Sequence, residues 1–211
     1  MKKIINRIKD FYSRGDIAFY ISLLGPFIMG TIHLVFVIIK FDWILFNYCL
    51  FFYLMCLARV WQWAIKKYQM KMSHYLAGII SLGFILLPMM AAFVLTIRYK
   101  DAPHYLIDWF IYAYATYGTI KMVFAIKNIL KKDKDDQRYV LSYVGLISAL
   151  YTIQMMEFNL IMTFDSGVDN SMYLMQLFTQ GAIFLFSLFV IGLFIYKINT
   201  KDDKEEKYVR R

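Results

Sequence analysis

The sequence predicts an all-α fold, a polytopic transmembrane bundle of six helices with the N-terminus and the C-terminus on the cytoplasmic side. Of the 211 residues, 60% are hydrophobic and the mean hydropathy is +0.50, whereas soluble domains average about 45–50% apolar residues. The apolar residues form six blocks, each at least as long as the roughly 20 residues that cross a hydrocarbon core. The basic residues lie mainly in alternate connections between these blocks.

The six predicted spans cover about residues 17–39, 43–65, 75–97, 105–126, 139–163 and 172–196. Because no water reaches the backbone at that depth, a chain can cross the bilayer only as helices or as a closed barrel. Long apolar runs without alternation exclude the barrel. Every connection is short, so consecutive helices are expected to be antiparallel neighbours in three hairpins.

Two charged segments flank the predicted transmembrane domain. Residues 1–16 form a basic N-terminal segment, and residues 198–211 form a charged tail. The tail mixes both signs of charge and contains few apolar residues, so we expect it to be solvated and disordered. The connections between the spans leave no room for a separate soluble domain.

The distribution of Lys and Arg predicts the orientation of the bundle. Nineteen lie in the N-terminal segment, the second and fourth connections and the tail, whereas the other connections contain only Lys40, Arg98 and Lys100. Because cytoplasmic connections carry the excess of basic residues, both termini are predicted inside. The net charge of +9 lies between apolar blocks rather than on one face. This argues against a nucleic-acid partner and indicates the bilayer, with its anionic headgroups on the cytoplasmic side.

Strongly polar side chains gather in the predicted outer halves of the spans. Glu157 lies six residues before the outer end of its span, and a short carboxylate there must be protonated, paired or in contact with water. The candidate ligand-binding residues at this depth are Glu157, Gln154, His33, Asp108, Gln176 and Gln180. They predict a polar cavity that opens outward. The alternative is that they hydrogen-bond between helices and hold the bundle together.

Two basic residues lie in the cytoplasmic thirds of their spans. Arg59 and Lys121 have stems long enough to carry their charges to the headgroups. We therefore interpret them as anchors on the cytoplasmic side, with a role in an inner gate or a phosphate contact as the alternative.

Catalytic and metal-binding motifs are absent from the sequence. It contains no HExxH, no paired-cysteine metal spacing, no phosphate-binding glycine loop and no GxSxG elbow. Cys49 and Cys56, the only cysteines, lie about 10 Å apart along one predicted helix, too far for a disulfide. They are predicted to be small buried side chains. We expect no metal and no cofactor, and a non-catalytic role is favoured.

One segment resembles a known group of proteins. The stretch Tyr112–Glu157 reads YAYATYGTIKMVFAIKNILKK, a charged loop, and then YVLSYVGLISALYTIQMME. It is similar to a segment of uncharacterised multi-pass membrane proteins of Gram-positive bacteria, which implies a bacterial plasma-membrane protein and no particular activity. In size and helix count the chain is also similar to the substrate-binding membrane subunits of vitamin importers. Those are rich in Gly and Ala at helix contacts, whereas this chain is bulky and aromatic.

Three hypotheses about function follow. The first is transport or capture of a small solute at the outer polar site, which would need an ion gradient or an energising partner subunit. The second is a non-catalytic sensor, accessory or assembly subunit of a membrane complex. The third is a membrane-embedded enzyme that uses Glu157 as an acid or base.

The predicted topology can be tested with introduced cysteines in a variant that lacks the two native ones. Cysteines at Ser13 and Thr200 should react with a membrane-impermeant reagent only after the cells are opened. A cysteine at Ser166 should react in intact cells. Labelling of position 200 from outside would contradict the model of six spans.

Overall fold

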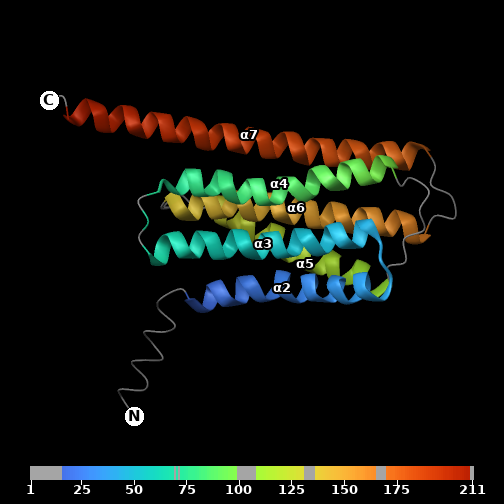
Figure 1. Cartoon of the computed structure of the whole chain (residues 1–211). Coiled ribbons are helices and arrows are strands. Elements are labelled where there is room, and N and C mark those ends of the chain that lie inside the picture. Colours follow the sequence, from blue (N-terminus) through green and yellow to red (C-terminus); the bar gives the residue numbers. More distant parts are fainter. Residues whose placement is uncertain are drawn as a thin grey trace, which may run out of the picture. The chain divides into compact units, whose positions relative to one another are not determined.

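The structure is a computed structural model that describes residues 16–68, 70, 72–98, 108–130, 136–164 and 170–209 (Figure 1). Its helices are α2 (Asp16–Ile39), α3 (Trp43–Lys67), α4 (His74–Arg98), α5 (Asp108–Leu130), α6 (Asp136–Phe164) and α7 (Asn170–Val209). The described residues contain no strand. The predicted all-α fold class is therefore confirmed.

Most of these helices are suited to a bilayer. Five stretches of the described chain are long and apolar enough to cross one: Ser22–Ile39, Trp43–Lys67, His74–Arg98, Asp136–Glu157 and Leu174–Thr200. The remaining predicted span, residues 105–126, overlaps α5, a helix of 23 residues that is not among these five stretches. The protein is thus an integral, multi-pass membrane protein.

The charged tail differs from our expectation. Helix α7 is 40 residues long and continues to Val209, so the prediction of a disordered tail is wrong. The segment after Thr200 contains no Gly or Pro and is rich in Lys and Glu, both of which are good helix formers. A helix that has already formed in the membrane needs no new nucleation to continue through such residues.

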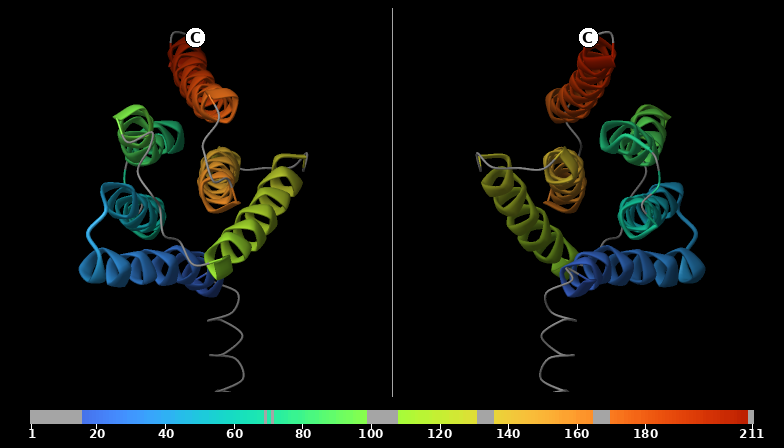
Figure 2. Two further views of the ribbon diagram at one scale, coloured as in Figure 1. Left: turned by 90° about the vertical axis from the view of Figure 1, so that its right-hand side faces the viewer. Right: turned by 90° about the vertical axis from the view of Figure 1, so that its left-hand side faces the viewer.

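The chain consists of two compact units, Met1–Met70 and Lys71–Arg211. The two-helix unit contains α2 packed on α3, and the four-helix unit contains α4 to α7. In the four-helix unit, α6 contacts each of the other three helices, and α4 packs on α7 as well as on α6. Figure 2 shows this arrangement nearly end-on, with α6 in the centre of the unit. Helices far apart in the sequence therefore build this core. The prediction that the third and fourth spans form a hairpin is wrong for the described residues, because α4 packs on α6 and α7 rather than on α5.

The hairpin of α2 and α3 is held by close packing along one face of α3. Asp42 caps α3, because its Oδ1 accepts from the backbone N–H of Ile44 at 2.6 Å. The two cysteines lie one above the other on the face toward α2, with the Sγ of Cys49 3.6 Å from the carbonyl of Gly30. Both cysteines are buried and neither is in a disulfide, which confirms the interpretation drawn from their spacing.

The core of the four-helix unit depends on the absence of a side chain at Gly78. A Cβ there would lie 2.5 Å from Cγ1 of Val140 on α6 and 2.9 Å from Cε2 of Phe194 on α7. Phe194 is fully buried, and Tyr75 and Tyr139 lie with ring centroids 5.9 and 6.4 Å from it. Three helices therefore meet around one phenylalanine, at a point where only glycine fits.

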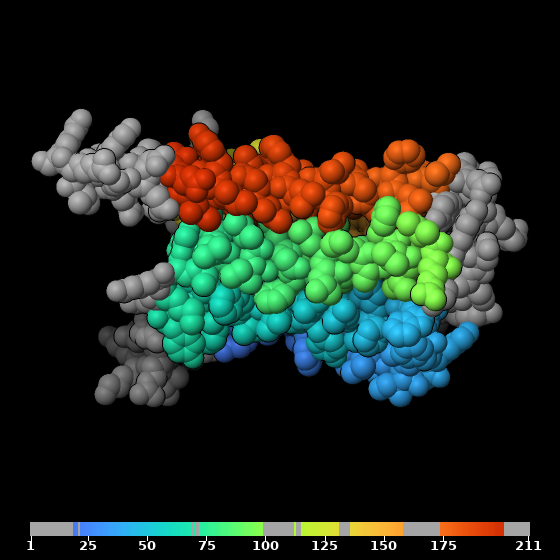
Figure 3. All heavy atoms as spheres, turned by 45° about the horizontal axis from the view of Figure 1, so that its top comes forward, coloured from blue at the N-terminus to red at the C-terminus, as the bar shows by residue number. Residues whose placement is uncertain are grey.

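The faces of α4 and α7 that point away from the core of the four-helix unit carry large apolar side chains. On α7, Phe178, Leu185 and Phe189 are 76%, 67% and 62% exposed. On α4, Leu87 and Val94 are 58% and 60% exposed, and both helices are visible on the face shown in Figure 3. Lipid chains supply the apolar surroundings that such faces need.

Substitution of Gly78 should test the close packing. Gly78→Ala is expected to lower stability by about 1–3 kcal/mol, because the added methyl group displaces Val140 or Phe194. Gly83→Ala on the same helix meets nothing within 4 Å and serves as the matched control, since both changes gain the same helix propensity. Thermal unfolding in mild detergent measures the difference. Equal stabilisation by both substitutions would contradict this account of the core.

Candidate polar site in the four-helix unit

The candidate ligand-binding residues are divided between the two units. His33 lies on α2 in the two-helix unit, whereas Gln154 and Glu157 lie on α6 and Gln176 and Gln180 lie on α7. Asp108 is the first residue of α5, and its side chain lies outside the described part of the structure. Five of the six candidates thus lie in the four-helix unit, and the side chains of four of them are described.

His33 is packed within its own hairpin. Its side chain is 1% exposed, and Nδ1 lies 2.6 Å from the carbonyl oxygen of Met29, one turn earlier on α2. A carbonyl can only accept, so Nδ1 is the donor in this hydrogen bond. The imidazole lies against Phe52, with ring centroids 5.4 Å apart, and edge-on to Tyr48 at 6.1 Å. These contacts favour a structural role for His33.

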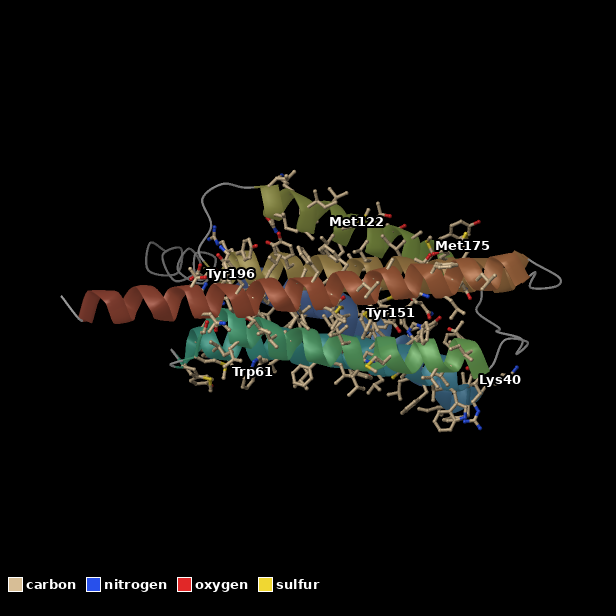
Figure 4. All side chains as sticks on the ribbon, turned by 90° about the horizontal axis from the view of Figure 1, so that it is seen from above. Lys40, Trp61, Met122, Tyr151, Met175 and Tyr196 are labelled. Carbon is tan, nitrogen blue, oxygen red and sulfur yellow. The ribbon has the colours of Figure 1, made fainter. Side chains whose placement is uncertain are left out.

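Two hydrogen bonds define the register of α4 on α6. The hydroxyl of Tyr75 donates to Oδ1 of Asp136 at 2.7 Å, and that of Tyr151 donates to the carbonyl of Pro88 at 3.3 Å. The paired positions differ by 61 and 63 residues, so a residue of α4 lies level with the residue about 62 positions later on α6. Thr96 on α4 therefore lies at about the same height along the helix axes as Glu157 on α6. Tyr151 is labelled in Figure 4.

Thr96 connects α4 to α7. Its hydroxyl donates to the carbonyl of Ala92 at 2.9 Å, and its Oγ1 accepts from Nε2 of Gln180 at 3.2 Å. Because the hydroxyl hydrogen is already used within α4, the oxygen can only accept, and this determines which end of the Gln180 amide faces it. The carbonyl end of Gln180 consequently points away from Thr96.

The two glutamines of α7 form a pair of buried amides. Gln176 and Gln180 are 3% and 7% exposed, and residues four apart lie on the same face of a helix, with Cβ atoms about 5–6 Å apart. Oε1 of Gln180 and Nε2 of Gln176 are buried and have no hydrogen-bond partner among the described residues. Buried polar atoms in proteins nearly always have a partner. One acceptor and one donor of the pair are therefore unsatisfied within the described structure.

Helix α6 adds polar groups at nearly the same level. Gln154 is 3% exposed, and Glu157 follows three residues later and is only partly buried. Of the acidic side chains described in the four-helix unit, Glu157 is the one in the predicted outer half. The register of α4 and α6 thus places a carboxyl group level with the Thr96–Gln180 hydrogen bond and Gln154 about one turn away.

The two candidate anchors are partly exposed. Arg59 lies on α3 and Lys121 on α5. The ammonium of Lys121 is 5.3 Å from the ring centroid of Tyr117, one turn earlier, which is within the range of a cation–π contact. Their role as anchors remains a prediction.

Sequence reasoning missed Thr96, which positions Gln180. A threonine near the end of an apolar block carries no signal by itself, because its importance arises from the packing of α4 on α7. No group of three or more His, Cys, Asp or Glu side chains that could hold a metal ion occurs among the described residues.

The fold and the site define a multi-pass α-helical membrane protein that has a buried pair of amides in its four-helix unit. Comparisons with models of protein families, with curated proteins and with solved structures find no match for the chain.

The Thr96–Gln180 hydrogen bond should contribute measurably to stability. Thr96→Val keeps the shape but leaves the amide nitrogen of Gln180 without its acceptor, which should cost about 1–3 kcal/mol. Thr179→Val is the control, because that exposed hydroxyl bonds only to the carbonyl of Met175 on its own helix. Unfolding in detergent measures both variants. The double variant Thr96→Val with Gln180→Leu should recover part of the stability that Thr96→Val loses. If the effects of the two changes on the free energy of unfolding simply add, the two side chains are not directly bonded.

Proposed function

We propose that the protein captures or transports a small polar solute in the predicted outer half of its four-helix unit. The observation that carries the proposal is the buried amide pair of Gln176 and Gln180. Thr96 orients the amide of Gln180, and Gln154 and Glu157 contribute further polar groups from α6. The proposal retains these four candidates from the sequence and adds Thr96.

The chemistry of the amide pair indicates the kind of solute. A hydroxyl or carboxamide group both donates and accepts, so one such group can donate to Oε1 of Gln180 and accept from Nε2 of Gln176. Leaving two polar atoms buried without partners costs about 1–3 kcal/mol each, and a bound solute would remove that cost. A carboxylate at Glu157 would add a preference for solutes that also carry a positive charge.

Cell location and energy coupling complete the proposal. The basic connections on one side and the resemblance to multi-pass proteins of Gram-positive bacteria support a place in a bacterial plasma membrane. Movement of a solute against its gradient needs energy, which an ion gradient or a partner subunit would supply.

One observation favours the second hypothesis, a sensor, accessory or assembly subunit. Only 22% of the apolar stretch of α7 and 28% of that of α2 are buried within the protein. Lipid can cover these faces, and so can the helices of a partner protein. A stable partner that co-purifies in mild detergent, without any bound solute, would favour this hypothesis over solute capture.

The solute hypothesis predicts opposite effects of one substitution on stability and on binding. The purified protein is screened by thermal shift against polyols, amides and amino compounds, and at least one class should raise the melting temperature. Gln176→Leu should abolish that shift while the solute-free protein keeps or gains stability, because a buried amide nitrogen without a partner is removed. Ser187→Ala, which removes a buried hydroxyl elsewhere on α7, should leave the shift intact.

Glu157→Gln in the same assay separates charged from neutral solutes. It should weaken binding of cationic solutes and leave neutral ones unchanged. If Gln176→Leu instead destabilises the solute-free protein and no compound shifts the wild type, the glutamines hold the helices together and the proposed function is wrong.

A further inference from the structure

The predicted outer end of the two-helix unit carries an exposed aromatic cluster. Phe41, Trp43 and Phe46 are 60%, 51% and 42% exposed. Their rings contact one another, with centroids 5.0 Å apart for Phe41 and Trp43 and 6.2 Å apart for Trp43 and Phe46. Asp42 holds this turn by capping α3. We call these three residues the outer aromatic cluster.

The predicted cytoplasmic end of the same unit carries a second aromatic group, which differs in charge. Trp63 on α3 stacks on Phe19 of α2, with centroids 5.1 Å apart and ring planes at 15°. The ammonium of Lys67 lies 4.2 Å from the ring centroid of Trp63, and Lys66 and Lys67 are both exposed. Phe19, Trp63, Lys66 and Lys67 form what we call the inner basic cluster.

The separation of the two clusters matches the thickness of a membrane. Trp43 and Trp63 are 20 residues apart on one continuous helix, which corresponds to about 30 Å at 1.5 Å per residue. The hydrocarbon core of a bilayer is also about 30 Å thick, and Trp is enriched at both of its interfaces. When one cluster lies at one interface, the other therefore reaches the opposite interface.

The two clusters differ in charge. The turn at the outer cluster contains Lys40 and Asp42, whose formal charges offset each other. The inner cluster has two lysines in the last turn of α3, against one acidic residue, Asp16, at the start of α2. Lysines near an anionic leaflet gain about 1 kcal/mol each, or about fivefold in association, and the ring of Trp63 holds the Lys67 ammonium at the level of the headgroups.

We infer that the inner basic cluster binds the headgroups of anionic phospholipids, with Lys66 and Lys67 contacting phosphate and Trp63 setting their depth. This surface lies in the two-helix unit and does not depend on the solute site proposed above. Its partner is lipid that is already present in the bilayer, so binding should appear as a preference of one lipid class over another next to Trp63.

The experiment uses the full-length protein with Trp63 as its only tryptophan, obtained by replacing Trp43, Trp61 and Trp109 with Phe. The protein is reconstituted into phosphatidylcholine vesicles that contain either brominated phosphatidylglycerol or brominated phosphatidylcholine, and quenching of Trp63 fluorescence reports which lipid lies beside it. Phosphatidylglycerol should be favoured severalfold at low salt. The preference should fall in concentrated salt, which screens exposed charges.

Two comparisons make the result decisive. In the Trp63-only protein, Lys66→Gln with Lys67→Gln should bring the preference close to one, while circular dichroism shows an unchanged helix content because both side chains are exposed. A matched protein with Trp43 as its only tryptophan should show little preference. Equal quenching by both lipids at Trp63, a preference that survives loss of both lysines, or the same preference at Trp43 would each overturn the inference.

Discussion

The bilayer requires every polar group to find its partner inside the protein, and this constraint shapes most of the structure. It makes the chain helical, because helices satisfy their own backbone. It also directs the hydroxyls of serine and threonine, which donate to carbonyls about one turn earlier on the same helix. Ser81 donates to Ala77 at 2.8 Å, and Ser187 donates to Ile183 at 2.7 Å. Hydroxyls bonded in this way do little to connect one helix to another.

Association of the helices therefore depends on shape and on a few specific bonds. At Gly78 and Gly118 a missing side chain lets neighbouring helices approach closely, since a Cβ on Gly118 would lie 2.9 Å from the side chain of Ile153. The bonds of Tyr75, Tyr151 and Gln180 join α4 to α6 and α7 at three different levels. Together these contacts give the four-helix unit a single register along its length.

The candidate site is one of the places where this constraint is not fully met. Thr96 follows the general pattern by donating to its own helix, and that leaves its oxygen as the acceptor that orients Gln180. The amide pair then presents polar atoms that the described protein does not satisfy, in a place where such atoms are costly. The proposed capture of a solute would give a physical reason for this cost. The register of α4 on α6 places the partly buried carboxyl of Glu157 level with the pair.

The sequence by itself determined the fold class and the positions of the helices, because the length of an apolar run is set directly by bilayer thickness. It also indicated that Gln176 and Gln180 share a face, since that depends only on the periodicity of one helix. The pattern of charges in the tail did not predict its helix, because that pattern contains no information on helix propensity. The role of Thr96, the close fit at Gly78 and the packing of α4 on α7 were decided only by the tertiary structure. Contacts between distant helices depend on the match of side-chain shapes across an interface, and no periodicity within one segment records that match.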